Sequence, residues 1–166
     1  VALDLIYPER QTVFVSLRNT ARLALGLLLL QIIYGGFVAG LNAGLIHNHW
    51  PMMSEGKFMH ETVLIEQPTL FSNLVEGKSG IQFVHRTVAY LVVAIILFLF
   101  YKSRKFILVT SQKRGLNILV LFVFIQFVLG VFTLLLHVPL WLGLLHQVMA
   151  FFLLSAMTFT LHRLSK

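Results

Sequence analysis

The sequence contains no cysteine and few charged residues. Without cysteine there is no disulfide framework, no thiolate metal ligand and no thiol chemistry. Charged residues make up only 11% of the 166 residues, whereas hydrophobic residues make up 58%. These proportions exclude an ordinary soluble domain and indicate a polytopic membrane protein. The lipid bilayer is therefore an expected partner of the chain.

Acidic residues are also scarce, and the net charge is +7, from 13 Lys and Arg against 6 Asp and Glu. A basic chain can bind nucleic acid, but in so apolar a sequence the positive residues are better explained as flanks of membrane helices. We therefore expect no nucleic-acid partner.

Four long apolar runs follow one another along the chain. Each is long enough to cross a hydrocarbon core of about 30 Å as a helix. They predict an all-α fold, a bundle of four transmembrane helices within a membrane domain at 21–162. The expected helices lie at about 21–46, 81–101, 116–136 and 141–161. Residues 1–20 are expected to be an N-terminal tail, or a linker from a missing N-terminal half.

The one long polar segment, about 47–80, is expected to be an outer loop with some structure of its own. It holds four glutamates and only two lysines, whereas most of the other basic residues fall on the opposite side of the threaded helices. Because Lys and Arg near short loops stay on the cytoplasmic side, both termini are predicted to be cytoplasmic.

Small residues recur near the end of the first run. Gly36, Gly40 and Gly44 fall four residues apart, so one face of a helix would be nearly free of side chains. Such spacing favours close helix packing, or the approach of a flat ligand.

Two histidines, His85 and His146, lie inside membrane-length segments. Both helices would enter from the outer side, which places each imidazole roughly 7 Å below that edge of the hydrocarbon. A single intramembrane histidine can simply bond a neighbouring helix, but two at equal depth favour shared ligation of one metal. In a four-helix bundle, the metal centre that fits best is a bis-histidine heme b iron. Zinc or copper would ordinarily require more ligands.

Two neighbours of His85 are further candidates for the site. Arg86 is expected either to extend toward lipid head groups or to pair with a heme propionate. Gln82 lies three residues before His85 and shares its helix face, which makes it a candidate hydrogen-bond partner of that histidine.

His47 and His49, close to Met52 and Met53, form a weaker candidate for a copper site. A cover over the heme edge at the membrane surface is the favoured interpretation of this segment.

A short motif is repeated between the first and third runs. Gln31 precedes Gly35 as Gln126 precedes Gly130, and each following helix carries one of the two histidines. Because membrane folds often repeat a helix pair, this pattern predicts that His85 and His146 are related by a pseudo-twofold axis.

Several motifs occur in a specific order. They are the glycine-rich stretch 35–44, Trp50-Pro51-Met52-Met53, Gln82-Phe83-Val84-His85-Arg86, Val138-Pro139 and His146-Gln147. Over about residues 22–160 this set resembles the second half of the heme A synthase family, whose members usually consist of two similar four-helix halves.

The resemblance implies a function in heme A biosynthesis and cytochrome oxidase assembly. The family oxidises a methyl group of heme O to the formyl group of heme A, and its second half holds a heme b on two histidines, here His85 and His146. It also implies an unidentified electron donor and a location in the bacterial cytoplasmic membrane, with the mitochondrial inner membrane less favoured.

One position departs from the family's first half. Gln82 stands where that half carries a catalytic glutamate, so the catalytic residue is unknown, and a separate N-terminal half or a second copy of the chain is expected to complete the enzyme. Two alternatives remain at this point: a self-contained bis-His membrane cytochrome b for electron transfer, and a heme-free assembly or transport subunit.

Overall fold

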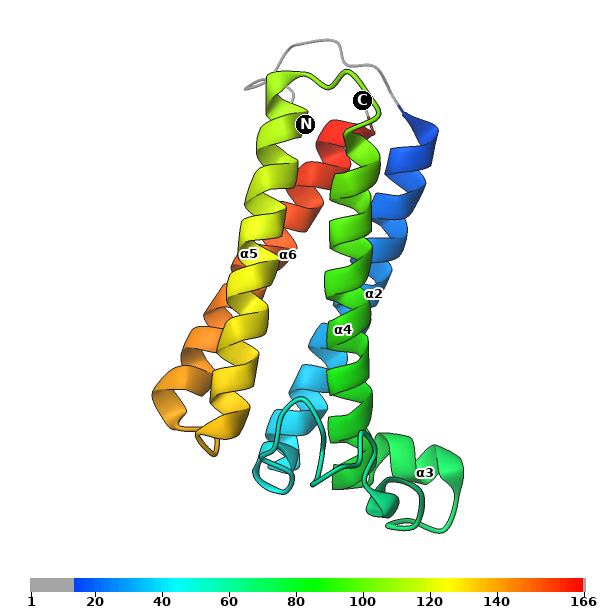
Figure 1. Cartoon of the computed structure of the whole chain (residues 1–166), viewed down its shortest axis with the longest axis vertical. Helices are drawn as coiled ribbons and strands as arrows, with labels where there is room; N and C mark the ends of the chain where they lie inside the picture. The colour runs from blue at the N-terminus through cyan, green and yellow to red at the C-terminus, as the bar shows by residue number, and fades with distance from the viewer. Residues whose placement is uncertain (1–13, 166) are drawn as a thin grey trace.

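The computed structural model describes residues 14–165, which form four long helices and three short ones (Figure 1). The long helices are α2 (Val15–Gly40), α4 (Lys78–Ser103), α5 (Thr110–Leu135) and α6 (Leu140–Leu164). The connection between α2 and α4 contains η1 (Ala43–Leu45), η2 (Glu61–Leu64) and α3 (Leu70–Val75). Within the described residues there is no β-strand.

The long helices confirm the predicted fold class, because all four are long and apolar enough to cross a membrane. The first differs at both ends: it begins at Val15 rather than near 21, and stops at Gly40 rather than near 46. The stop comes from Asn42, whose φ of 52° lies in the left-handed region that asparagine tolerates and that ends a helix. Of the expected tail, residues 1–13 lie outside the described residues.

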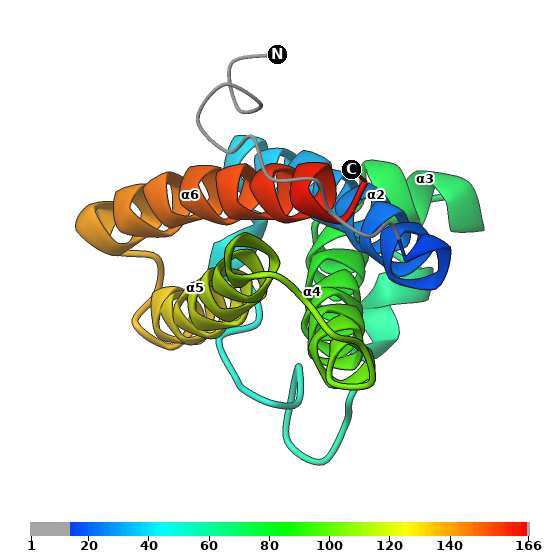
Figure 2. The same cartoon turned by 90° about the horizontal axis from the view of Figure 1, so that it is seen from above.

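The four helices form two antiparallel pairs. Helix α2 packs mainly on α4, and α5 packs mainly on α6. Figure 1 shows that the pairs lie close together where α2 begins and α6 ends, here called the terminal end, and diverge toward the opposite, loop end. The view from above in Figure 2 places the α5–α6 pair beside the α2–α4 pair.

The main hydrophobic core lies mostly in the half of the bundle near the terminal end. Its buried side chains come mainly from the first half of α2, the second half of α4, the first half of α5 and the second half of α6. They include Leu17 to Leu28, Val88 to Leu99, Leu116 to Val123 and Leu153 to Leu164. The loop half, which contains both intramembrane histidines, contributes little to this cluster: Val88 belongs to it and Val84 packs against it.

Polar side chains also hold the terminal end together. The Lys102 ammonium of α4 donates to the Ser16 carbonyl at 3.2 Å and to the Thr20 hydroxyl at 3.0 Å, both on α2. Arg163 of α6 is only 1% exposed and donates to the Ser111 hydroxyl of α5 at 3.0 Å. Each pair is thereby joined at this end as well as by packing.

A tight turn joins α5 to α6 at the loop end. His137 and Val138 have φ of 60° and 55°. The N–H of Val138 donates to the Thr133 carbonyl at 2.8 Å, and that of His137 donates to the Leu134 carbonyl at 3.1 Å. This is the Schellman arrangement, in which the last carbonyls of a helix are satisfied by the residues that follow it.

The small-residue face does not pack on another helix of the described chain. A Cβ at Gly36 or Gly40 would have no neighbour within 4 Å. Gly44 lies beyond the end of α2, where a Cβ would approach the Val138 side chain to 2.9 Å. The expected helix contact through this face is therefore wrong within the described residues, and Gly44 instead accommodates the α5–α6 turn.

Candidate functional site

His85 of α4 lies against α2 in the loop half of the bundle. The Gln31 amide nitrogen is 3.2 Å from its Nδ1 and 3.3 Å from its Nε2. One helical turn further along α2, Gly35 leaves room for the ring, because a Cβ there would lie 3.3 Å from Cε1 of His85. The imidazole therefore lies directly against the α2 backbone.

His146 of α6 has the same surroundings on α5. The Gln126 amide nitrogen is 3.3 Å from its Nε2. A Cβ at Gly130 would lie 3.0 Å from its Cε1. The other ring nitrogen, Nδ1, is buried and has no hydrogen-bond partner among the described residues.

The two histidines occupy comparable positions in different helix pairs. Each lies about two turns from the loop end of its helix, and His85 is within electrostatic range of His146. Both imidazoles are half-buried. Both histidines lie on the loop side of most of the core cluster.

Arg86 binds the loop that follows α2. Its Nη2 donates to the carbonyl oxygens of His49, Pro51 and Met52 at 2.9, 3.0 and 3.0 Å. Its Nη1 is buried without a partner among the described residues. One side of the guanidinium therefore anchors the loop, while the other side offers unpaired N–H groups to an anion.

Gln82 has a different partner from the expected one. It is 2% exposed, and its amide nitrogen donates to the His47 carbonyl at 3.3 Å. The expected contact with His85 is made by Gln31 instead. Gln82 and Arg86 together hold the segment from His47 to Met52 against α4.

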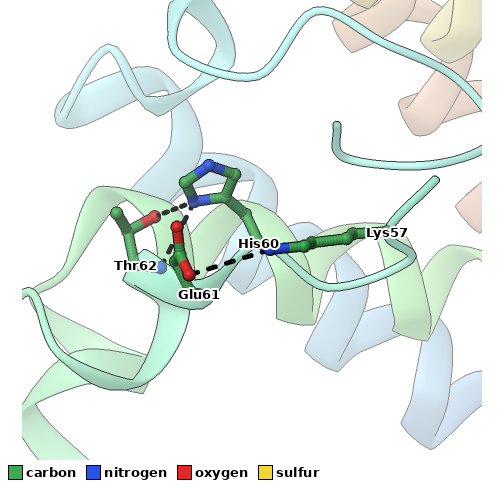
Figure 3. A network of polar contacts seen from close by, with 4 residues as sticks. All are labelled: Lys57, His60, Glu61 and Thr62. Carbon is green, nitrogen blue, oxygen red and sulfur yellow. Dashed lines mark hydrogen bonds and ion pairs between the residues drawn. The ribbon is translucent and has the colours of Figure 1, made fainter. Parts of the chain in front are cut away.

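The imidazoles of His47 and His60 stack outside the bundle, with ring centroids 4.6 Å apart. His47 is 3.1 Å from the Ser79 hydroxyl. Figure 3 shows the contact of His60 with Thr62, and the Thr62 hydroxyl donates to the same Ser79 hydroxyl at 2.8 Å. Partial burial lowers the pKa of His47 below its ordinary value of 6.5, and His60 lowers it further. His47 therefore stays neutral at pH 7 and fastens the loop to the start of α4.

Aromatic side chains of the loop reach across to the second helix pair. Trp50 packs edge-on against Phe127 of α5, with ring centroids 6.3 Å apart. Phe127 also contacts Tyr90 of α4 at 5.8 Å, and Tyr90 contacts Phe58 at 6.2 Å. This part of the loop forms an aromatic cover over α4 and α5.

The donor set fits a heme iron better than a bare metal ion. Across residues 14–165, no group of three or more His, Cys, Asp or Glu side chains is placed to hold a metal. In the segment considered for copper, His49 is exposed and His47 is bonded to Ser79. Two imidazoles, one with an unpartnered buried nitrogen, are instead a donor set that a heme can use.

Sequence reasoning did not place Gln31 and Gln126 in the site. The repeated Gln-xxx-Gly spacing was the signal that pointed to them, because it puts an amide and a gap one turn apart on the same helix face. Their contacts with the histidines cross between helices and become visible only in the structure.

The chain matches the family model described as cytochrome oxidase assembly protein over residues 2–158. No solved structure matches it.

Curated proteins similar to the chain carry the name heme A synthase. The protein from Flavobacterium johnsoniae is 72% identical over 167 residues, which cover 100% of this chain and 49% of that protein. The one from Flavobacterium psychrophilum is 63% identical over 166 residues, with 100% and 49% covered. A third, from Wolbachia pipientis wMel, is 39% identical over 140 residues, with 84% and 37% covered. The chain spans about half the length of the first two relatives and matches their C-terminal half.

Proposed function

This chain belongs to the cytochrome oxidase assembly protein family, and we propose that it is the C-terminal half of a heme A synthase. In this proposal His85 and His146 hold a heme b through its iron. The bound heme supports oxidation of the heme O methyl group to the formyl group of heme A. The proposed setting is the bacterial cytoplasmic membrane.

One observation supports the proposal: two imidazoles from different helix pairs lie at matching positions, each against a glycine of the neighbouring helix. These glycines are Gly35 for His85 and Gly130 for His146. The buried Nδ1 of His146, which no described residue pairs with, has a lone pair available to a metal.

The ligand set also indicates what the heme would do. His85 and His146 would hold the heme iron, and a heme held by two imidazoles would supply electron transfer. Oxidation of the methyl group then takes place elsewhere in the complete enzyme, and the catalytic residue is not assigned to this chain. An N-terminal half, or a second copy of the chain, supplies the heme O site.

Arg86 and Gln82 serve this site by holding the loop. Arg86 Nη1, buried and unpaired among the described residues, is suited to a heme propionate, because a guanidinium binds a carboxylate through charge-assisted hydrogen bonds. Gln82 fixes the His47 carbonyl, so that the loop covers the site. The loop end faces outward and the basic terminal end faces the cytoplasm.

The first experiment asks whether the two histidines bind heme. The natural full-length protein that contains the chain is purified in detergent, and its visible spectrum is recorded for the wild type, His85→Ala and His146→Ala. The exposed His49→Ala is the matched control. We expect a sharp low-spin heme b spectrum that either intramembrane substitution removes and His49→Ala preserves. Retention of the band in both intramembrane variants would exclude the axial assignment.

The second candidate function is a self-contained bis-His cytochrome b, because one chain supplies both imidazoles. The second experiment distinguishes it from the synthase. Cells that supply heme O express the wild type or His146→Ala, and their hemes are extracted and separated. Heme A that depends on His146 supports the synthase. Low-spin heme b without heme A would identify the electron-transfer protein, and a heme-free product would indicate an assembly or transport subunit.

A further inference from the structure

The repeated motif that opposes the two histidines has a role that the proposed heme ligation alone does not explain. Gln31 and Gly35 of α2 contact His85, and Gln126 and Gly130 of α5 contact the ring of His146. The residue types and the four-residue spacing are the same in both helix pairs. Both contacts use the same residue types at the same spacing, and both approach ring nitrogens and Cε1 of a histidine. Such agreement is not expected of two unrelated packing contacts.

Each glycine fixes how closely the ring approaches the helix. A Cβ would come within 3.3 Å of Cε1 at Gly35 and within 3.0 Å at Gly130. Both distances are shorter than an ordinary van der Waals contact, so any larger residue would push the ring away. The ring edge that carries Cε1 is therefore presented to the glutamine on the same helix face.

Each glutamine retains one unused polar atom. The amide oxygens Oε1 of Gln31 and Gln126 are both buried and have no hydrogen-bond partner among the described residues. An unpaired buried amide oxygen costs free energy. In both glutamines, Oε1 can therefore accept a hydrogen bond. The equivalent positions suggest that the donor is of the same kind in both helix pairs.

A metal-bound imidazole supplies such a donor. A neutral histidine that gives one ring nitrogen to a metal carries its proton on the other, and that N–H seeks an acceptor. Rotation of the glutamine side-chain amide by half a turn exchanges its nitrogen and oxygen while keeping the position of the group. After this rotation the glutamine Oε1 would lie beside the ring nitrogen and would accept a hydrogen bond from the imidazole N–H.

We propose that Gln31 and Gln126 are positioning residues for the two heme ligands, each accepting the imidazole N–H through its amide oxygen. This inference rests on the proposed heme b function. Each glutamine selects the tautomer and the rotation of its histidine, and together they set how much electron density the imidazoles donate to the iron. Because the two bonds are equivalent, the pseudo-twofold relation between the histidines extends to their hydrogen-bond partners.

The test compares apolar and acidic substitutions in the full-length protein. Gln31→Leu and Gln126→Leu remove the acceptor, whereas Gln31→Glu and Gln126→Glu strengthen it. Gln147→Leu is the matched control, because Gln147 is exposed and adjoins His146 on the same helix. Heme affinity is measured by titration with the visible spectrum, and the midpoint reduction potential by spectroelectrochemistry.

Loss of the acceptor is expected to weaken heme binding by about 10- to 100-fold. The midpoint potential should rise in the leucine variants, because a less basic imidazole stabilises the oxidised iron less. It should fall in the glutamate variants, where a carboxylate makes the imidazole more basic. The control should match the wild type in both measurements. A purely packing role for the glutamines predicts no such opposite shifts.

Two results would overturn the inference, and they are distinguishable. If His85→Ala and His146→Ala lose heme while every glutamine variant keeps wild-type affinity and potential, the positioning role is wrong and the heme site stands. If the histidine variants keep the heme, the proposed function itself fails. Should the leucine variants lose helicity by circular dichroism, the potential of the glutamate variants decides.

Discussion

The side-chain nitrogen of Asn48 lies 2.8 Å from the Leu134 carbonyl oxygen and 2.8 Å from that of Gly44. Asn48 follows α2, and Leu134 belongs to the last turn of α5. The Asn48 amide therefore links the segment after α2 to α5 at the loop end, in addition to the aromatic contacts of Trp50 and Tyr90 with Phe127.

Replacement of Asn48 by alanine should loosen this end of the bundle. Two hydrogen bonds are lost, and we expect a destabilisation of about 1–3 kcal/mol. The measurement is thermal unfolding in detergent, followed by circular dichroism. Ser155→Ala is a suitable control, because its hydroxyl bonds only the carbonyl of Phe151 in its own helix. Equal melting temperatures for the two variants would show that Asn48 does not join the pairs.

The glycines opposite the histidines should differ in their tolerance of a methyl group. Gly130→Ala is expected to weaken heme binding more than Gly35→Ala, because its Cβ would be closer to the imidazole, 3.0 Å against 3.3 Å. Gly36→Ala and Gly143→Ala are matched controls, since a Cβ at either position has no neighbour within 4 Å. Spectral titration with heme measures the order, and the reverse order would contradict this geometry.

The outer loop should loosen in mild acid through His47. Its pKa is lowered by burial and by His60, with smaller effects from Arg86 and His49 in the same direction, while Glu66 raises it. The folded loop therefore disfavours the protonated form. The stability of the loop falls as the pH drops below 6.5, and continues to fall until the pH reaches the lowered pKa of the folded state.

Trp50 fluorescence can follow this change in a Trp141→Phe background, because Trp50 packs on Phe127. The transition should have its midpoint below pH 6.5 and disappear in His47→Gln. His49→Gln should retain it. A transition that survives in His47→Gln would assign the effect to another group.

Glu66 should stabilise the start of α4 in a pH-dependent way. Its carboxylate accepts from the backbone N–H groups of Lys78 and Ser79, both at 2.9 Å. Although burial raises the pKa of Glu66, the hydrogen bonds from Ser79 and Lys78 lower it by more, and the net shift is below its ordinary value of 4.5. The contribution is thus complete above pH 4.5 and is lost as the pH falls through the lowered pKa.

Glu66→Gln is expected to cost about 0.5 kcal/mol at neutral pH, since an anion at an exposed helix N-terminus contributes on that scale. Glu61→Gln is the control. Its carboxylate forms only an exposed ion pair with Lys57 at 3.7 Å, shown in Figure 3, and such pairs contribute little. Chemical unfolding at pH 7 and pH 4 should show a pH-dependent difference for Glu66→Gln alone.

The fold class could be predicted because apolar runs of membrane length leave few alternatives to helices. The end of α2 could not, since the residues from Leu41 to Ile46 are as apolar as the helix before them. The left-handed backbone of Asn42 ends the helix there. A hydropathy pattern alone does not predict a left-handed backbone conformation at a single residue.

The sequence proposed two candidate ligands for the site, and it misjudged the hydrogen-bond partner of one of them. Depth in the membrane singled out His85 and His146, but the helix-face argument then chose Gln82, which lies on the same helix as His85. The side chain that bonds His85 is Gln31, from the neighbouring helix. Spacing within one helix cannot determine which side chains a second helix brings beside it, so this contact depends on tertiary packing.

The concentration of the core in the terminal half of the bundle has a dynamic consequence. Local opening requires little free energy where few apolar contacts must be broken. Backbone amides of the loop half should therefore exchange with solvent deuterium sooner than amides at equal depth in the other half. A planar group could enter between the helix pairs through such partial opening while the other half remains folded.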